Sequence, residues 1–326
     1  IKILTMAALA TAVFASCSSE DELAQNNYPM DNVVRIMTSV DGMNTRASYG
    51  NSTDKLNSFG FCINNAGNTK YTYDNIKITQ KNGNWNPATQ MLWQNSTTAV
   101  NILAYAPYQE TTEDANGKVK VFGKTDYAFS VKEDQSNAED YSSDLIVYKQ
   151  TGFKPESDLN TNQAVDVTFT HLLSQLNLTI ELRDQFNQDE KKPVTSATVT
   201  DVKVDGTFIR SKVNFAADPI SVQFDGMASK AITPETVAFT KADKTTDHAT
   251  FKYSAIVIPQ WIRAGVFCIS FKVNGNDYIW TSTSDVNFVS GKKHDLLLLV
   301  GKDVVQGGAI TAKPWGEETI TEKETD

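Results

Sequence analysis

The sequence is short of cysteine, histidine and clustered cations, and each shortage excludes a class of protein. Its three cysteines form no CxxC pair and its three histidines no HExxH motif, so we predict no metal site and no cofactor. No run of lysine and arginine occurs, and the formal net charge is -9. The chain therefore lacks the clustered cations with which proteins displace counterions from nucleic acids.

Catalytic motifs are missing as well. The sequence contains no GxSxG, no P-loop and no GxGxxG following a strand. Carboxylates are plentiful, but no spacing singles out a pair for glycoside hydrolysis. We therefore predict that the protein is not an enzyme. A secreted hydrolase is kept as a rival, which two carboxylates facing one another in a cleft would support.

Three features have two interpretations each. Cys62 and Cys268 could form a disulfide, but two buried free thiols are favoured. The acidic segment EDQSNAED (133–140) is interpreted as a solvated turn rather than a calcium site. Tryptophans are expected in the core or rim of a β-sandwich, with a sugar-stacking platform as the alternative, and five are present: Trp85, Trp93, Trp261, Trp280 and Trp315.

The N-terminal segment is typical of an exported bacterial protein. Lys2 precedes an apolar run from Ile3 to Ala15, which is too short to span a bilayer and fits the core of a signal peptide. Small residues directly before Cys17 resemble a lipobox, although Phe14 departs from the usual aliphatic residue. We predict a lipoprotein signal peptide at 1–16 and lipidation of Cys17, with an ordinary secretory signal as the alternative. The following SSEDE resembles the surface-export signal of outer-membrane lipoproteins in the Bacteroides group.

Beyond residue 30, apolar and polar residues alternate with period two, which predicts β-strands. The first such segment is 33–40, where Val34, Ile36, Thr38 and Val40 share one face. Further strands are expected at 58–63, 71–78, 99–105, 126–131, 144–149, 165–170, 176–182, 197–204, 249–258, 266–273, 277–282 and 295–300. This pattern predicts an all-β protein built from β-sandwiches. Trp93 and one face of 99–105 (Val100, Ile102 and Ala104) are expected in the core, and HLLSQL (171–176) is the one expected helical turn.

The order of several motifs resembles the fimbrillins, the subunits of type V pili in the Bacteroides group. The similar segments are the acidic leader, TRAS (45–48), SFGFCI (58–63), MLWQ, VNILAYAPY (100–108), VKEDQSNAEDYSSDLIV (131–147), VDVTFTHLLSQLNLTIEL (165–182) and KPWG (313–316). Their shared order extends over nearly the whole chain.

The resemblance implies two tandem transthyretin-like β-sandwich domains and a lipid-anchored route to the outer membrane. It divides the chain into a propeptide with a removable first strand (17–46), an N-terminal domain (47–158) and a C-terminal domain (159–326). It also implies that an arginine-specific protease cuts between Arg46 and Ala47 and removes the strand with Val34, Ile36, Thr38 and Val40. A strand from another pilin subunit would then fill the vacated edge. The alternative is that Arg46 is an ordinary surface arginine in a lipoprotein linker.

Two functions are consequently expected. The first is a structural subunit of a type V fimbria, at the tip, as an accessory or in the stalk, which supports adhesion at the cell surface. The charged tail GEETITEKETD offers few alternating apolar residues for donation, whereas GGAITA (307–312) is a possible start of a donated segment. The alternative is a surface glycan-binding lipoprotein, which several coplanar exposed tryptophans would support.

Overall fold

The computed structural model describes residues 27–40, 55–110, 120–226, 229–243 and 248–315. Strands dominate this part of the chain. Its helices are a 3-10 turn, Thr69–Tyr71, and two four-residue α-helices, α1 (Pro155–Asp158) and α2 (Asp184–Asn187). The predicted all-β class is confirmed. No helix among the described residues is long and apolar enough to cross a membrane.

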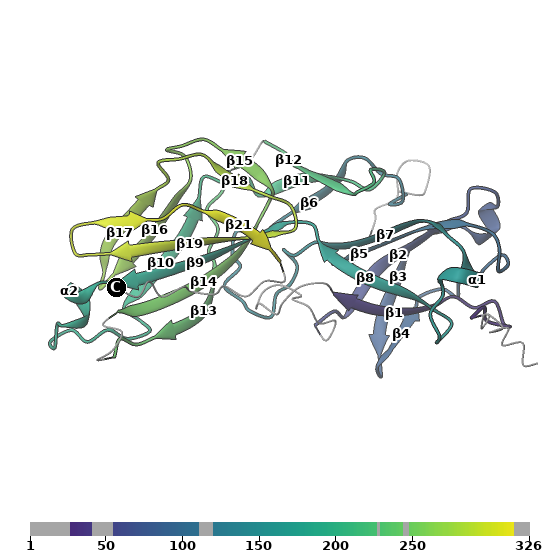
Figure 1. Cartoon of the computed structure of the whole chain (residues 1–326), viewed down its shortest axis with the longest axis horizontal. Helices are drawn as coiled ribbons and strands as arrows, with labels where there is room; N and C mark the ends of the chain where they lie inside the picture. The colour runs from purple at the N-terminus through teal and green to yellow at the C-terminus, as the bar shows by residue number, and fades with distance from the viewer. Residues whose placement is uncertain (1–26, 41–54, 111–119, 227–228, 244–247, 316–326) are drawn as a thin grey trace, which may run out of the picture.

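One end of the elongated molecule is a seven-stranded sheet (Figure 1). Its order is β1-β8-β7-β5-β2-β3-β4. The strands are β1 (Arg35–Val40), β8 (Ala164–His171), β7 (Ile146–Phe153), β5 (Val100–Ala106), β2 (Ser58–Asn64), β3 (Tyr73–Lys81) and β4 (Asn84–Pro87). We call this part the N-terminal lobe. Its strands pair antiparallel except β1, which runs parallel to β8 along one edge.

The opposite end, which we call the C-terminal lobe, contains four smaller sheets (Figure 1). The main one has the order β13-β14-β9-β19-β20, and β21 also pairs with β19. Its strands are β13 (Glu235–Thr240), β14 (Ala249–Val257), β9 (Ser174–Leu182), β19 (Lys292–Val300), β20 (Val305–Gly307) and β21 (Thr311–Pro314). The others are β10 (Val199–Asp205), β16 (Cys268–Val273) and β17 (Asn276–Thr281); β6 (Tyr127–Ser130), β11 (Arg210–Asn214) and β12 (Ser221–Phe224); and β15 (Gln260–Ile262) with β18 (Val286–Phe288).

Strand pairing does not follow chain order around residues 158 and 159. β8 comes after this point but completes the N-terminal sheet between β7 and β1. β6 comes before it but pairs with β11 of the C-terminal lobe. The division into domains at 47–158 and 159–326 stays a prediction.

The core has two clusters because alternate side chains of a strand point to opposite faces. On β5, Ile102 and Ala104 lie in the N-terminal cluster, whereas Leu103 and Tyr105 belong to the larger cluster shared with the C-terminal lobe. Val100, Ile102, Ala104 and Trp93 are at most 5% exposed, which confirms their predicted burial.

The helical turn predicted at 171–176 is wrong. His171 ends β8 and Ser174 begins β9, so this segment carries the chain from one sheet to the next. All six side chains are buried, whereas a surface helix would expose one side. The backbone bonds to other segments: Leu172 N–H donates to Leu145 O at 2.9 Å, and Gly291 N–H donates to Leu173 O at 2.8 Å.

Candidate functional site: the first strand and its edge

β1 occupies one edge of the N-terminal sheet. It pairs with β8 in parallel over its whole length, from Arg35 opposite Ala164 to Val40 opposite Phe169. Parallel pairing needs a long connection between the strands, and here the whole N-terminal lobe lies between them in sequence. β1 is therefore held to β8 by a ladder between segments that are remote in sequence.

The residues just before β1 form hydrogen bonds with a second segment, residues 91–93. Val34 N–H donates to Met91 O at 3.0 Å, and Trp93 N–H donates to Asn32 O at 2.8 Å. Val33 forms an antiparallel bridge with Leu92. We call the surface formed by β8 and residues 91–93 the β1 site. The contact with residues 91–93 was not predicted from the sequence, although these residues belong to the MLWQ motif.

The inward face of β1, together with Val34 directly before it, is apolar. Val34, Ile36 and Val40 are 3%, 8% and 5% exposed and lie in the same cluster as Phe61 and Phe169. Thr38 is half-buried, and its Oγ1 has no hydrogen-bond partner among the residues that the structure describes. Burying each of the three aliphatic side chains contributes roughly 1.5–3 kcal/mol. The four residues therefore lie on one side of the strand, as the alternation in the sequence predicted. Proteolytic removal of this strand stays a prediction.

The outward face of β1 makes polar contacts. The Asn160 and Asn162 side-chain amides donate to Met37 Sδ at 3.4 and 3.3 Å, and Ser39 donates to Thr168 Oγ1 at 3.1 Å. Arg35 Nη2 lies 2.7 Å from Asp31 Oδ2, and this hydrogen bond lowers the pKa of the Asp31 carboxyl. Because such an exposed ion pair adds little stability, the apolar side chains contribute more than Arg35 to holding this strand, beside its main-chain ladder with β8.

Lipidation at Cys17 and cleavage at Arg46–Ala47 concern positions outside the described residues. The structure therefore places the predicted strand residues in the β1 site. Lipidation at Cys17 and cleavage at Arg46–Ala47 stay predictions.

The comparisons with known proteins agree with this fold. A profile described as fimbrillin-like matches residues 45–315. The chain belongs to the fimbrillin-like family. No curated protein gives a significant match.

Solved structures resemble the fimbrillin-like chain at low sequence identity. A candidate cell adhesion protein from Bacteroides ovatus has a TM-score of 0.62 at 13% identity, over 88% of this chain and 98% of its own. A second, from Bacteroides uniformis, has a TM-score of 0.55 at 20% identity, over 88% and 99%. A fimbrial protein from Bacteroides vulgatus has a TM-score of 0.50 at 16% identity, over 87% and 99%. At such identities the likeness concerns the fold.

The cysteines of this fimbrillin-like chain that the structure describes are both free thiols, as predicted. Cys62 is buried, and its burial raises the pKa of its thiol well above the usual value. Cys268 is half-buried rather than buried, because it lies on the less buried face of β16, opposite to Ile269.

The tryptophans do not form a platform. Trp93 and Trp315 are buried, Trp85 and Trp280 are half-buried, and only Trp261 is exposed, at 52%. Stacking a sugar ring across several tryptophans needs their faces in solvent. The tryptophans therefore give no support to the predicted alternative of a glycan-binding platform.

The acidic segment 133–140 is only partly a solvated turn. Gln135 is 4% exposed, its amide donates to Ile256 O at 2.9 Å, and Ile256 N–H donates to its Oε1 at 2.8 Å. Asp134 instead accepts from Ser136 N–H at 3.0 Å. The segment therefore fastens to β14, and within the described part of the chain no group of side chains is arranged to hold a metal ion.

Proposed function

We propose that this chain is a fimbrial subunit that is exported as a lipoprotein and assembled by exchange of its first strand. Lipid at Cys17 would hold the precursor at the outer membrane, and an arginine-specific protease would cut between Arg46 and Ala47. Family membership supports the fimbrial role. The fimbrial protein from Bacteroides vulgatus, which shares this fold, supports a location on the cell surface.

The observation that carries the proposal is the edge position of β1. Its apolar side chains fill the N-terminal core while its main chain completes the ladder with β8. Losing the strand would expose apolar surface and unpaired main-chain groups, and a strand from another pilin subunit would satisfy both. While β1 stays in place, the edge is occupied and the precursor remains a monomer.

The C-terminal strands favour a tip or accessory role over a stalk role. β20 and β21 both pair with β19 of the same chain, and Trp315, directly after β21, is 5% exposed. A subunit that keeps β20 and β21 in its own sheet does not donate them to a neighbour, although it can still accept a strand from another subunit.

Arg46→Ala tests the proposal. We expect the variant to be folded, exported and lipid-anchored but absent from fimbriae, because β1 stays covalently attached and occupies the β1 site. The measurement is electron microscopy with gel analysis of boiled and unboiled material sheared from cells. Arg263→Ala, a change in an exposed turn, is the matched control and should assemble normally.

The mature N-terminus of the sheared protein provides a second readout. Ala47 as the first residue supports cleavage, whereas a lipidated Cys17 at the N-terminus of assembled protein indicates a permanently anchored subunit. Normal polymerisation of the Arg46→Ala protein would contradict strand exchange.

A further inference from the structure

A pocket of about 580 Å³ lies at the far end of the C-terminal lobe. It is formed by α2 and the segment after it, the turn from β16 into β17 together with β17 itself, and the β19–β20 turn with the start of β20. These segments are remote in sequence. Figure 1 shows α2 and the β16–β17 turn at the left end of the molecule, whereas β1 lies in the lobe on the right. A ligand bound here would not interfere with the β1 site.

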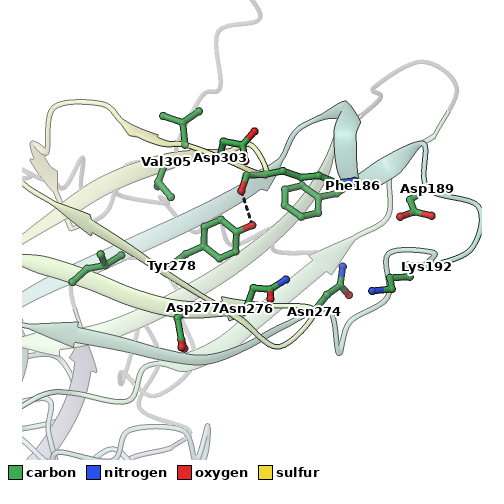
Figure 2. Close-up of a pocket in the computed structure, with 12 residues that line it drawn as sticks. Phe186, Asp189, Lys192, Asn274, Asn276, Asp277, Tyr278, Asp303 and Val305 are labelled. Atoms are coloured by element: carbon green, nitrogen blue, oxygen red, sulfur yellow. Dashed lines mark hydrogen bonds between the residues drawn. The ribbon is translucent and has the colours of Figure 1, made fainter.

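Contacts within the protein hold the pocket walls together. Tyr278 stacks on Phe271 with ring centroids 5.7 Å apart, and its hydroxyl donates to Lys302 O at 3.1 Å (Figure 2). Lys302 N–H donates to Gln185 Oε1 at 2.7 Å, which ties the β19–β20 turn to α2. Asn274 and Gly275 both have positive φ, as a two-residue β-turn of the primed type requires. The site therefore needs little ordering, which reduces the entropic cost of binding.

Several polar groups at the pocket are available to a ligand. The side chains of Asn274, Asn276 and Lys192 form no hydrogen bond with any other residue that the structure describes. Figure 2 shows them directed toward the space beside the rings of Phe186 and Tyr278. The two amides supply donors and acceptors, and the ammonium supplies donors only.

Apolar surface accompanies these polar groups. Ile279 is 63% exposed and Val304 is 53% exposed at the rim. A ligand for this pocket must therefore carry many groups that both donate and accept hydrogen bonds, together with an apolar face. A sugar ring has this combination, in its hydroxyls and its C–H face.

Charge narrows the ligand class further. Lys192 and Lys302 line the pocket, but so do Asp189, Asp277 and Asp303, so an anionic ligand gains no net attraction. We propose that this pocket binds a neutral saccharide, and that the protein thereby attaches to a glycan at the end remote from β1. This proposal does not depend on strand exchange.

The test is an array of neutral mono- and oligosaccharides of glucose, galactose, mannose and their N-acetylated amino sugars. The full chain is applied to this array. Calorimetric titration then measures the affinity of each saccharide that binds. We expect at least one saccharide to bind. The double variant Asn276→Ala/Lys192→Ala should weaken this binding by about tenfold or more, because it removes two hydrogen-bonding groups.

Trp261→Ala is the matched control, since Trp261 is the one exposed tryptophan and lies outside the pocket. It should bind as the wild type does, and all variants should remain folded, with melting temperatures within a few degrees of the wild type. The proposal is overturned if no saccharide on the array binds, if the double variant binds unchanged, or if Trp261→Ala abolishes binding.

Discussion

At the scale of single residues, one buried contact joins two motifs from distant parts of the chain. The indole ring of Trp315, from the KPWG motif, stacks on the imidazole of His171, with centroids 3.9 Å apart and planes at 9°. His171 Nδ1 lies 3.0 Å from Asp144 Oδ1, and both of these side chains are at most 1% exposed. The stack fixes the end of β21 against the point where β8 passes into β9.

We therefore expect Trp315→Ala to lower the free energy of unfolding by roughly 3–5 kcal/mol, through lost packing and the cavity it leaves. Thermal or denaturant unfolding measures the change. Trp261→Ala should lower it by less than about 1 kcal/mol, since this ring is 52% exposed. Equal losses in the two variants would show that the stack does not hold the C-terminal strand.

At the scale of elements, the sequence predicted the strands that carry a buried, alternating face and missed others. β1 and β9 alternate over six and nine residues, so periodicity alone located them, whereas β5 was located as a nearly continuous apolar run that is buried on both faces. Among the missed strands, β4, β12, β18 and β20 have three or four residues each, too few for a period to stand out. The longer strands β11 and β13, with five and six residues, were missed as well.

Pairing was harder to predict than the strands themselves, because partners are chosen by packing between remote segments. The face of β1 could be read from Val34, Ile36 and Val40, but neither its parallel partner β8 nor the contact of residues 32–34 with 91–93 has a local signal. The same holds for Gln135, whose amide bonds to Ile256, a partner remote in sequence.

The two faces of β1 give a prediction at this scale. Ile36→Asp should destabilise the precursor by several kcal/mol, because it places an unpaired carboxylate in the N-terminal core. Met37→Asp, one residue along and 42% exposed, should have a much smaller effect. Denaturant unfolding of the uncleaved chain distinguishes them. The assigned face would be incorrect if the Met37 variant were the less stable.

At the scale of the whole molecule, the two lobes depend on each other. Tyr105 of β5 packs against Tyr127 and Phe215 of the C-terminal lobe, with ring centroids 5.6 and 5.7 Å apart. Lys149 Nζ of β7 donates to the carbonyl oxygens of Phe215, Ala216 and Ala217 at 3.1, 3.1 and 2.7 Å. The core of one lobe therefore continues into the other.

A fragment that ends at residue 158 should consequently not fold. It contains β1 and β7 but lacks β8, the strand that lies between them, and it contains β6 without its partner β11. Its edges would expose unpaired main-chain groups, and Tyr105 and Tyr127 would lose the contact with Phe215. Amide NMR spectra of residues 27–158 should show the narrow dispersion of an unfolded chain, whereas residues 27–315 should give a dispersed spectrum. A dispersed spectrum from the short fragment would instead establish residues up to 158 as an independent folding unit, with β8 added to a sheet that forms without it.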